Sequence, residues 1–128
     1  MARFLLDTQA FVVLVTEGID RFSRNVRETL VNLDHELLFS TVSLSEIAIK
    51  TSIGKLAFTS EKVLRAVADL RLTTAPYTPA HAKRLFDLPL HHRDPFDRML
   101  IATALAEDIS IVASDREFKK YKGLRVIW

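Results

Sequence analysis

The stretch "HHRDPFDRMLIATALAEDISIVASD", residues 91–115, joins a predicted helix to a predicted strand. Asp94 followed by Pro95 is typical of a helix start, because aspartate caps the first turn and proline is tolerated at its first position. The run "ISIVAS" is short, apolar and β-branched, as a buried strand is, and it is followed by Asp115. The stretch therefore predicts a helix–strand unit with carboxylates at the helix start and after the strand.

The same alternation extends along the rest of the chain. Further strands are predicted at 3–6, 36–42, 71–77 and 124–128, and helices at 22–33, 43–55, 60–70, 78–89 and 94–108. Residues 10–18, "AFVVLVTEG", are ambiguous, since β-branched residues favour a strand whereas Gly18 suits a helix end. Strands that alternate with helices indicate an α/β fold of three layers, in which a mostly parallel sheet of about five strands is covered on both faces.

Composition narrows the class of protein. A chain of 128 residues, 48% hydrophobic and 27% charged, is expected to form one globular domain over residues 1–128. The absence of cysteine excludes disulfides and thiolate metal sites. The apolar runs are too short for a membrane span and the N-terminus does not resemble a signal peptide, so we expect a cytoplasmic protein without a membrane partner. The basic segment "REFKKYKGLR", 116–125, is either a solvated surface or a phosphate contact.

Four acids are predicted to meet at one edge of the sheet. Asp7 and Asp115 directly follow strands, while Glu46 and Asp97 are expected in the first turns of helices. Carboxyl ends of parallel strands and the helix starts that follow them share an edge, where sites of such folds form. Each acid also has an ordinary role: Asp7 and Asp115 as helix caps, Glu46 as the capping-box partner of Ser43, and Asp97 as a complement to the helix dipole.

Acids that converge in this way require a cation, because close carboxylates raise one another's pKa. Oxygen ligands without histidine or cysteine suit Mg²⁺ or Mn²⁺, ions that can polarise a phosphodiester and supply hydroxide. The spacing thus predicts hydrolysis of a nucleic-acid backbone. We interpret Asp94 as the cap that supports Asp97. Arg98 is expected to contact phosphate or pin a carboxylate, with a surface salt bridge as the alternative.

The chain resembles the PIN domain, and within it the VapC-like ribonuclease toxins of bacterial type II toxin–antitoxin pairs. The likeness is carried, in family order, by "FLLDTQAF", "STVSLSEIAIKTSIGKL", "HHRDPFDRMLIATALAED" and "IVASDREFKKY". It implies a metal-dependent endoribonuclease whose acidic quartet binds Mg²⁺ or Mn²⁺. Carried over by position, the quartet is the same as the one chosen from spacing: Asp7, Glu46, Asp97 and Asp115. Thr8 and Ser114 match positions where the family often has a hydroxyl that assists ligand geometry, with capping as the alternative role.

The resemblance also implies partners: an RNA substrate, a cognate antitoxin protein that blocks the site, and a second copy in a homodimer. The helices within 43–70 would form the groove for the antitoxin, although core packing alone could explain their apolar faces. Gln9 departs from the family pattern, because relatives often carry Asn or His at this position. His91 and His92 are adjacent and are therefore interpreted as loop residues in contact with phosphate rather than as ligands of one ion.

Two other functions fit parts of the sequence. A non-catalytic module could keep the fold and bind RNA or a partner protein, although retention of all four acids argues against it. An α/β protein that transfers phosphoryl groups to an aspartate needs paired acids around its first strand. Only Asp7 lies there in this chain. Detection of a covalent phosphoryl-Asp7 intermediate would be needed to support this function.

Overall fold

Strand β1 (Arg3–Leu6) lies at the centre of a five-stranded sheet with the order β3-β2-β1-β4-β5. The computed structural model describes residues 2–128. The other strands are β2 (Glu36–Ser40), β3 (Thr73–Ala75), β4 (Ser110–Val112) and β5 (Val126–Ile127). All four strand pairings are parallel. The predicted α/β fold and its five strands are confirmed, and the part of the sheet described here is entirely parallel.

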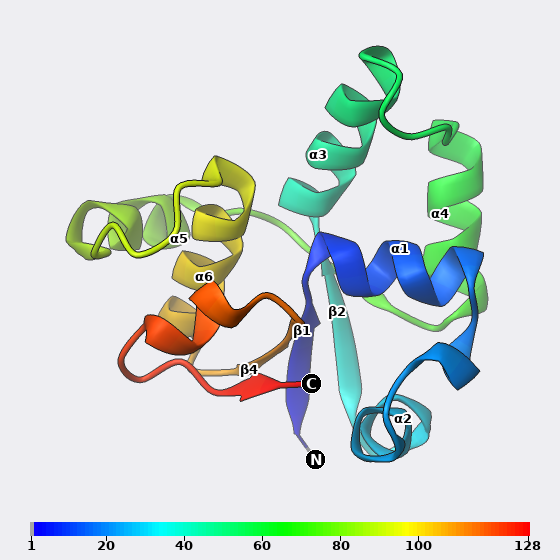
Figure 1. Cartoon of the computed structure of the whole chain (residues 1–128), viewed down its shortest axis with the longest axis horizontal. Helices are drawn as coiled ribbons and strands as arrows, with labels where there is room; N and C mark the ends of the chain where they lie inside the picture. The colour runs from blue at the N-terminus through cyan, green and yellow to red at the C-terminus, as the bar shows by residue number, and fades with distance from the viewer. Residues whose placement is uncertain (1) are drawn as a thin grey trace.

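Helices cover both faces of the sheet (Figure 1). They are α1 (Thr8–Thr16), α2 (Arg24–Val31), α3 (Thr41–Ser52), α4 (Ser60–Asp69), α5 (Pro79–Arg84) and α6 (Pro95–Glu107). Phe4 and Leu6 of β1 belong to a core cluster with residues of α1, α2 and α4, whereas Leu5 between them belongs to a second cluster with residues of α6. This alternation follows from the two-residue period of a strand. No helix within residues 2–128 combines the length and apolar character needed to cross a membrane.

The ambiguous segment "AFVVLV" is part of helix α1. The Asp7 side chain caps this helix by accepting a hydrogen bond from the Ala10 N–H, at 2.7 Å. Ala10, Phe11 and Leu14 are buried at helical spacing, and the Phe11 ring packs on Phe39 of β2 with 4.5 Å between centroids. The cap and the burial of this face outweigh the strand preference of the β-branched residues, which is a weak, context-dependent term.

The N-cap of helix α3 lies three residues earlier than predicted, and this corrects the predicted role of Glu46. The cap is Ser40, the last residue of β2, whose hydroxyl accepts the Val42 N–H at 3.0 Å. The chain therefore passes from strand to helix without a loop. Ser43 lies inside the first turn and Glu46 in the second, so the capping box predicted for this pair was wrong. Glu46 is thus free of a capping role.

The basic segment 116–125 presents only some of its side chains at the surface. It contains the 3₁₀ helix η3 (Arg116–Lys120) and the turn that follows. The aromatic residues Phe118 and Tyr121 are buried in the second core cluster. They therefore do not alternate with lysines on the surface, and the exposed part of this segment is basic without stacking partners.

The order of the strands places a crevice beside β1. The chain builds β2 and β3 on one side of β1 and then crosses to build β4 and β5 on the other. At such a switch point, connections leave β1 and β4 in opposite directions and open a crevice at their carboxyl ends. The backbone holds this edge together, since the Asp7 N–H donates to the Val112 carbonyl at 3.0 Å.

Candidate metal centre

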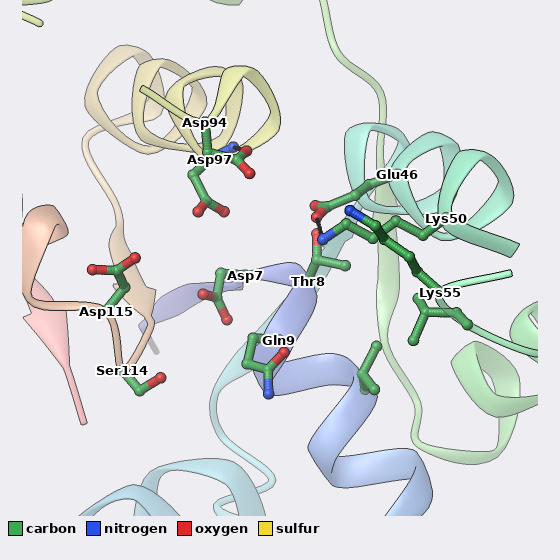
Figure 2. Close-up of a pocket in the computed structure, with 12 residues that line it drawn as sticks. Asp7, Thr8, Gln9, Glu46, Lys50, Lys55, Asp94, Asp97, Ser114 and Asp115 are labelled. Carbon is green, nitrogen blue, oxygen red and sulfur yellow. Dashed lines mark hydrogen bonds and ion pairs between the residues drawn. The ribbon is translucent and has the colours of Figure 1, made fainter. Parts of the chain in front are cut away.

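A cavity of about 510 Å³ opens at this edge of the sheet (Figure 2). All four acids singled out by the sequence line it, on segments that are far apart in the chain. The cavity is also lined by three of the four predicted supporting residues, by two lysines and by Gln9, which differs from the family pattern. The polar lining comprises Asp7, Thr8, Gln9, Glu46, Lys50, Lys55, Asp94, Asp97, Ser114 and Asp115. The structure thus brings the acids together, while their role as ligands stays a prediction.

Asp7 is almost completely buried at the base of this cavity, with 3% of its surface exposed. Its pKa is raised to about 8, chiefly by burial; the hydrogen bond from Ala10 opposes this rise, and the charges of Asp97, Glu46 and Asp115 add to it. Ion-free Asp7 is consequently a poor place for a negative charge. A nearby cation would offset both causes.

Thr8, the next residue, is buried and turns away from a capping role. Its hydroxyl donates to the Ser43 hydroxyl at 2.9 Å, and this bond joins the start of α1 to the first turn of α3. The two helices that carry Asp7 and Glu46 at or near their starts are therefore held together directly beside the cavity. A role of Thr8 in ligand geometry stays a prediction.

Glu46 projects from α3 and is 3% exposed. Its Oε2 accepts a hydrogen bond from Lys50 Nζ, one turn later on the same helix. Its Oε1 is buried and has no hydrogen-bond partner among residues 2–128. The bond to Glu46 raises the pKa of Lys50, so this lysine is charged. A buried carboxylate oxygen without a donor is costly, and a cation in the cavity is the kind of partner that would satisfy it.

Removing Lys50 is expected to expose this cost. In EDTA, Lys50→Met should lower the free energy of unfolding by about 1–3 kcal/mol, because Glu46 then keeps a buried charge without its donor. Urea unfolding measures the change. Lys55→Met, which removes an exposed lysine from the same cavity, is the matched control and should leave stability nearly unchanged. The double variant Glu46→Gln/Lys50→Met should recover most of the loss; a loss that persists there would contradict this explanation.

Asp97 lies in the first turn of α6, as predicted. Its backbone N–H donates to Asp94 Oδ1 at 2.9 Å, so Asp94 is the helix cap. The pKa of Asp97 is raised to about 6, chiefly by burial and then by the charges of Asp94 and Glu46, while His92 lowers it. Asp97 is therefore part of the same repelling cluster as Asp7.

Asp115 follows β4 and is the most exposed of the four acids, with 45% of its side chain accessible. It caps η3, since its Oδ1 accepts the Glu117 N–H at 2.9 Å. Its other oxygen, Oδ2, lies 3.2 Å from His92 Nε2. Ser114 lies beside it in the cavity wall. Like Asp7, Asp115 caps the helix that follows it with one oxygen, and its second oxygen lies beside His92.

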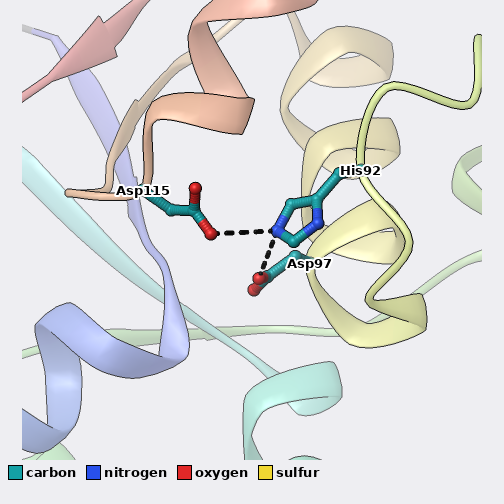
Figure 3. A group of neighbouring side chains, drawn as sticks. All are labelled: His92, Asp97 and Asp115. Carbon is teal, nitrogen blue, oxygen red and sulfur yellow. Dashed lines mark hydrogen bonds and ion pairs between the residues drawn. The ribbon is translucent and has the colours of Figure 1, made fainter.

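His92, interpreted from the sequence as a loop residue in contact with phosphate, lies in a loop and contacts two of the acids, which the sequence analysis did not predict (Figure 3). Its Nε2 lies 2.9 Å from Asp97 Oδ2 as well as 3.2 Å from Asp115 Oδ2. One potential ligand atom from each of these three residues lies within 4.8 Å of the others. The neighbouring His91 is exposed and packs edge-on against the Tyr121 ring, 5.0 Å away. The conformation of an irregular loop decides this difference, and no spacing rule predicts it.

Within residues 2–128, Arg98 neither pins a carboxylate nor forms a surface salt bridge, while the predicted phosphate contact stays a prediction. Its guanidinium donates to the carbonyls of Pro89 at 3.0 Å, His92 at 3.3 Å and Leu88 at 3.4 Å, rather than to a carboxylate. Unpaired carbonyls in an irregular loop need donors, and the planar fork of arginine supplies several at once. Arg98 therefore holds the loop that carries His92.

The comparisons with known proteins agree with this fold. The model of the PIN domain family matches residues 4–124. The structure of VapBC2 from Rickettsia felis, bound to a promoter DNA fragment, has a TM-score of 0.74 and 18% identity over 98% of each chain. DNA-bound VapBC from Salmonella typhimurium has a TM-score of 0.73 and 20% identity over 99% of this chain and 98% of that one. FitAcB from Neisseria gonorrhoeae has a TM-score of 0.59 and 16% identity over 98% of this chain and 96% of that one. No curated protein matches in sequence.

Proposed function

The chain belongs to the PIN domain family, and we propose that it is a metal-dependent endoribonuclease that acts as the toxin of a type II toxin–antitoxin pair. The proposed ligands of Mg²⁺ or Mn²⁺ are Asp7, Glu46, Asp97 and Asp115. The observation that carries the proposal is the buried Oε1 of Glu46, which has no donor among the residues that the structure describes and faces a cavity lined by three further acids. A donor set made of carboxylate oxygens suits these hard divalent ions.

The electrostatics of the cavity support a cation at this place. The pKa of Asp7 is raised to about 8 and that of Asp97 to about 6, largely by burial and by neighbouring acids. When bound, the ion would polarise a phosphodiester and lower the pKa of a coordinated water. The carboxylates hold it, and their own positions are fixed by the caps of α1, α6 and η3.

The lysines of the cavity are suited to the substrate. Lys50 and Lys55 line the wall next to Glu46, so the cavity carries positive charge beside its acids (Figure 2). Lys55 is exposed and can reach a backbone phosphate, because a phosphate needs only a mobile positive charge as its partner. We propose that these lysines place the RNA backbone across the carboxylates, in a cavity open enough to admit it.

Cleavage of a circular RNA tests the enzymatic part of the proposal. The purified chain should cut the circle in Mn²⁺ or Mg²⁺ and stop in EDTA, with activity restored by added ion. A circle has no ends, so its linearisation reports an endonuclease. RNA binding without any cut in Mn²⁺ would contradict the proposal and favour a non-catalytic module, whereas a ³²P-labelled aspartyl phosphate would favour phosphoryl transfer.

The toxin part of the proposal predicts a protein partner. The solved structures named above are VapBC or FitAB complexes, and we propose that this chain likewise binds a cognate antitoxin and forms a homodimer. An apolar cavity of about 220 Å³ lies between α3 and α4, lined in part by Leu44, Ile47 and Phe58. Co-expression with the neighbouring upstream reading frame should yield a stable complex of both proteins. Recovery of the chain alone would count against the toxin assignment.

A further inference from the structure

His92 is fixed in place by three residues from two separate segments, helix α6 and the segment of η3 with its cap. Its backbone N–H donates to Tyr121 Oη at 2.8 Å, and its carbonyl accepts from Arg98 at 3.3 Å. Its ring packs edge-on against Phe118, 5.7 Å between centroids. The surroundings thus hold both the backbone and the ring of His92 in one position, although this residue lies in an irregular loop.

The hydrogen bonds of the ring determine where its proton lies. Nδ1 is 3.4 Å from the backbone N–H of Asp94, a group that can only donate. Nδ1 must therefore accept, and in a neutral imidazole the proton then resides on Nε2. This Nε2–H donates to Asp97 Oδ2 at 2.9 Å, and Asp115 Oδ2 lies 3.2 Å from the same nitrogen (Figure 3).

We propose that His92 is a positioning residue of the metal centre, which holds Asp97 and Asp115 together for one cation; the inference rests on the proposed function. Asp97 belongs to α6 and Asp115 to the segment after β4, so no backbone hydrogen bond of a shared element sets their separation. The Nε2–H donates to Asp97 Oδ2, and Asp115 Oδ2 lies within 3.2 Å of the same nitrogen, so one oxygen of each acid is drawn to His92. Asp97 Oδ1 stays available as a ligand, and outer groups that orient metal-binding carboxylates strengthen binding in this way.

A direct ligand role for His92 is disfavoured by the same geometry. Nε2 can bind a cation only through its lone pair, so the proton would have to move to Nδ1. The Nδ1–H would then face the N–H of Asp94, donor against donor. The short distances among His92, Asp97 and Asp115 are therefore those of a hydrogen-bonded clamp rather than of three ligands around one ion.

Manganese binding to the full chain without RNA tests this inference, by titration calorimetry or by electron paramagnetic resonance of free Mn²⁺. His92→Leu, which removes the donor, is expected to raise the Kd about tenfold or more. His92→Gln, whose amide N–H₂ can donate near the position of Nε2, should keep most of the affinity. His91→Leu is the matched control, because His91 is exposed and its ring packs on Tyr121, and should bind as the wild type does.

Each outcome decides between specific alternatives. If the wild type binds no Mn²⁺, the proposed function fails and takes this inference with it. If the wild type binds and His92→Leu binds equally well or more tightly, only the clamp is overturned, and tighter binding would mean that the ring competes with the ion. Equal losses in His92→Leu and His92→Gln would make Nε2 a ligand and also overturn the clamp. If His92→Leu does not fold, His92→Phe is used in its place, because it also lacks the donor but keeps a ring packed against Phe118.

Discussion

The substitution Asp97→Asn is expected to slow RNA cleavage by about a hundredfold to a thousandfold while the chain stays folded. Asparagine keeps the size of the side chain, and its carbonyl oxygen can still accept the hydrogen bond of His92. It removes the negative charge that we propose binds the cation, and single groups that stabilise charge in an active site are worth about 10²–10³ in rate. The measurement is the initial rate of circular-RNA cleavage at a saturating Mn²⁺ concentration.

Asp34→Asn is the matched control for this variant. Asp34 is exposed in the turn before β2, at the edge of the sheet opposite to the cavity, so the same chemical change should leave the rate unaltered. Circular dichroism and urea unfolding establish that both variants are folded. Cleavage by Asp97→Asn at the wild-type rate would show that Asp97 is not part of the catalytic site.

The substitution Asp7→Asn is expected to lower the cleavage rate by a factor similar to that of Asp97→Asn. At the same time it should stabilise the ion-free protein. An amide oxygen can still accept the Ala10 N–H and cap α1, so the structural role of Asp7 is preserved. The substitution removes the buried carboxylate of Asp7, which lies beside three other acids. The pKa of Asp7 is raised to about 8, chiefly by burial. In EDTA at pH 8, the free energy of unfolding should rise by about 2–5 kcal/mol.

The pH dependence of this gain has a definite sign. The pKa of Asp7 is about 8 in the folded protein, above the value of 3.8 expected for the unfolded chain. Between these values the folded state binds more protons than the unfolded state, so this carboxyl lowers stability progressively as the pH rises. The difference between Asp7→Asn and the wild type should therefore be small at pH 4 and increase until about pH 8.

Urea unfolding of both proteins in EDTA at several pH values measures the difference, and other titrating groups cancel because they are common to both. A gain that is equally large at pH 4 would mean that the buried charge of Asp7 is not its cause. A loss of both activity and stability would indicate that Asp7 acts mainly through its cap. A substitution that lowers activity and raises stability is typical of an active-site residue, because a buried charge that is needed for activity destabilises the folded protein.

Local patterns were sufficient to predict most of the fold. Strand β1 has the predicted bounds, and α5 and α6 begin at prolines preceded by Thr78 and Asp94, which act as caps. The start of α3 was predicted wrongly because Ser40 and Ser43 are both good caps and only the end of β2 selects between them. The segment "AFVVLV" was undecided because its propensity and its burial favour different structures, and burial was settled by tertiary contacts.

The sequence by itself indicated which acids would share an edge, because the carboxyl ends of parallel strands and the helices that follow them lie at the same edge of a sheet. In the structure, one cavity is lined by Asp7, Glu46, Asp97 and Asp115. Only the tertiary structure decided their partners. The contact of His92 with two acids and the grip of Arg98 on its loop depend on an irregular segment, whose path is set by long-range contacts with Tyr121 and Phe118. Periodicity describes elements whose hydrogen bonds are local, whereas a loop takes its shape from whatever distant groups satisfy its backbone.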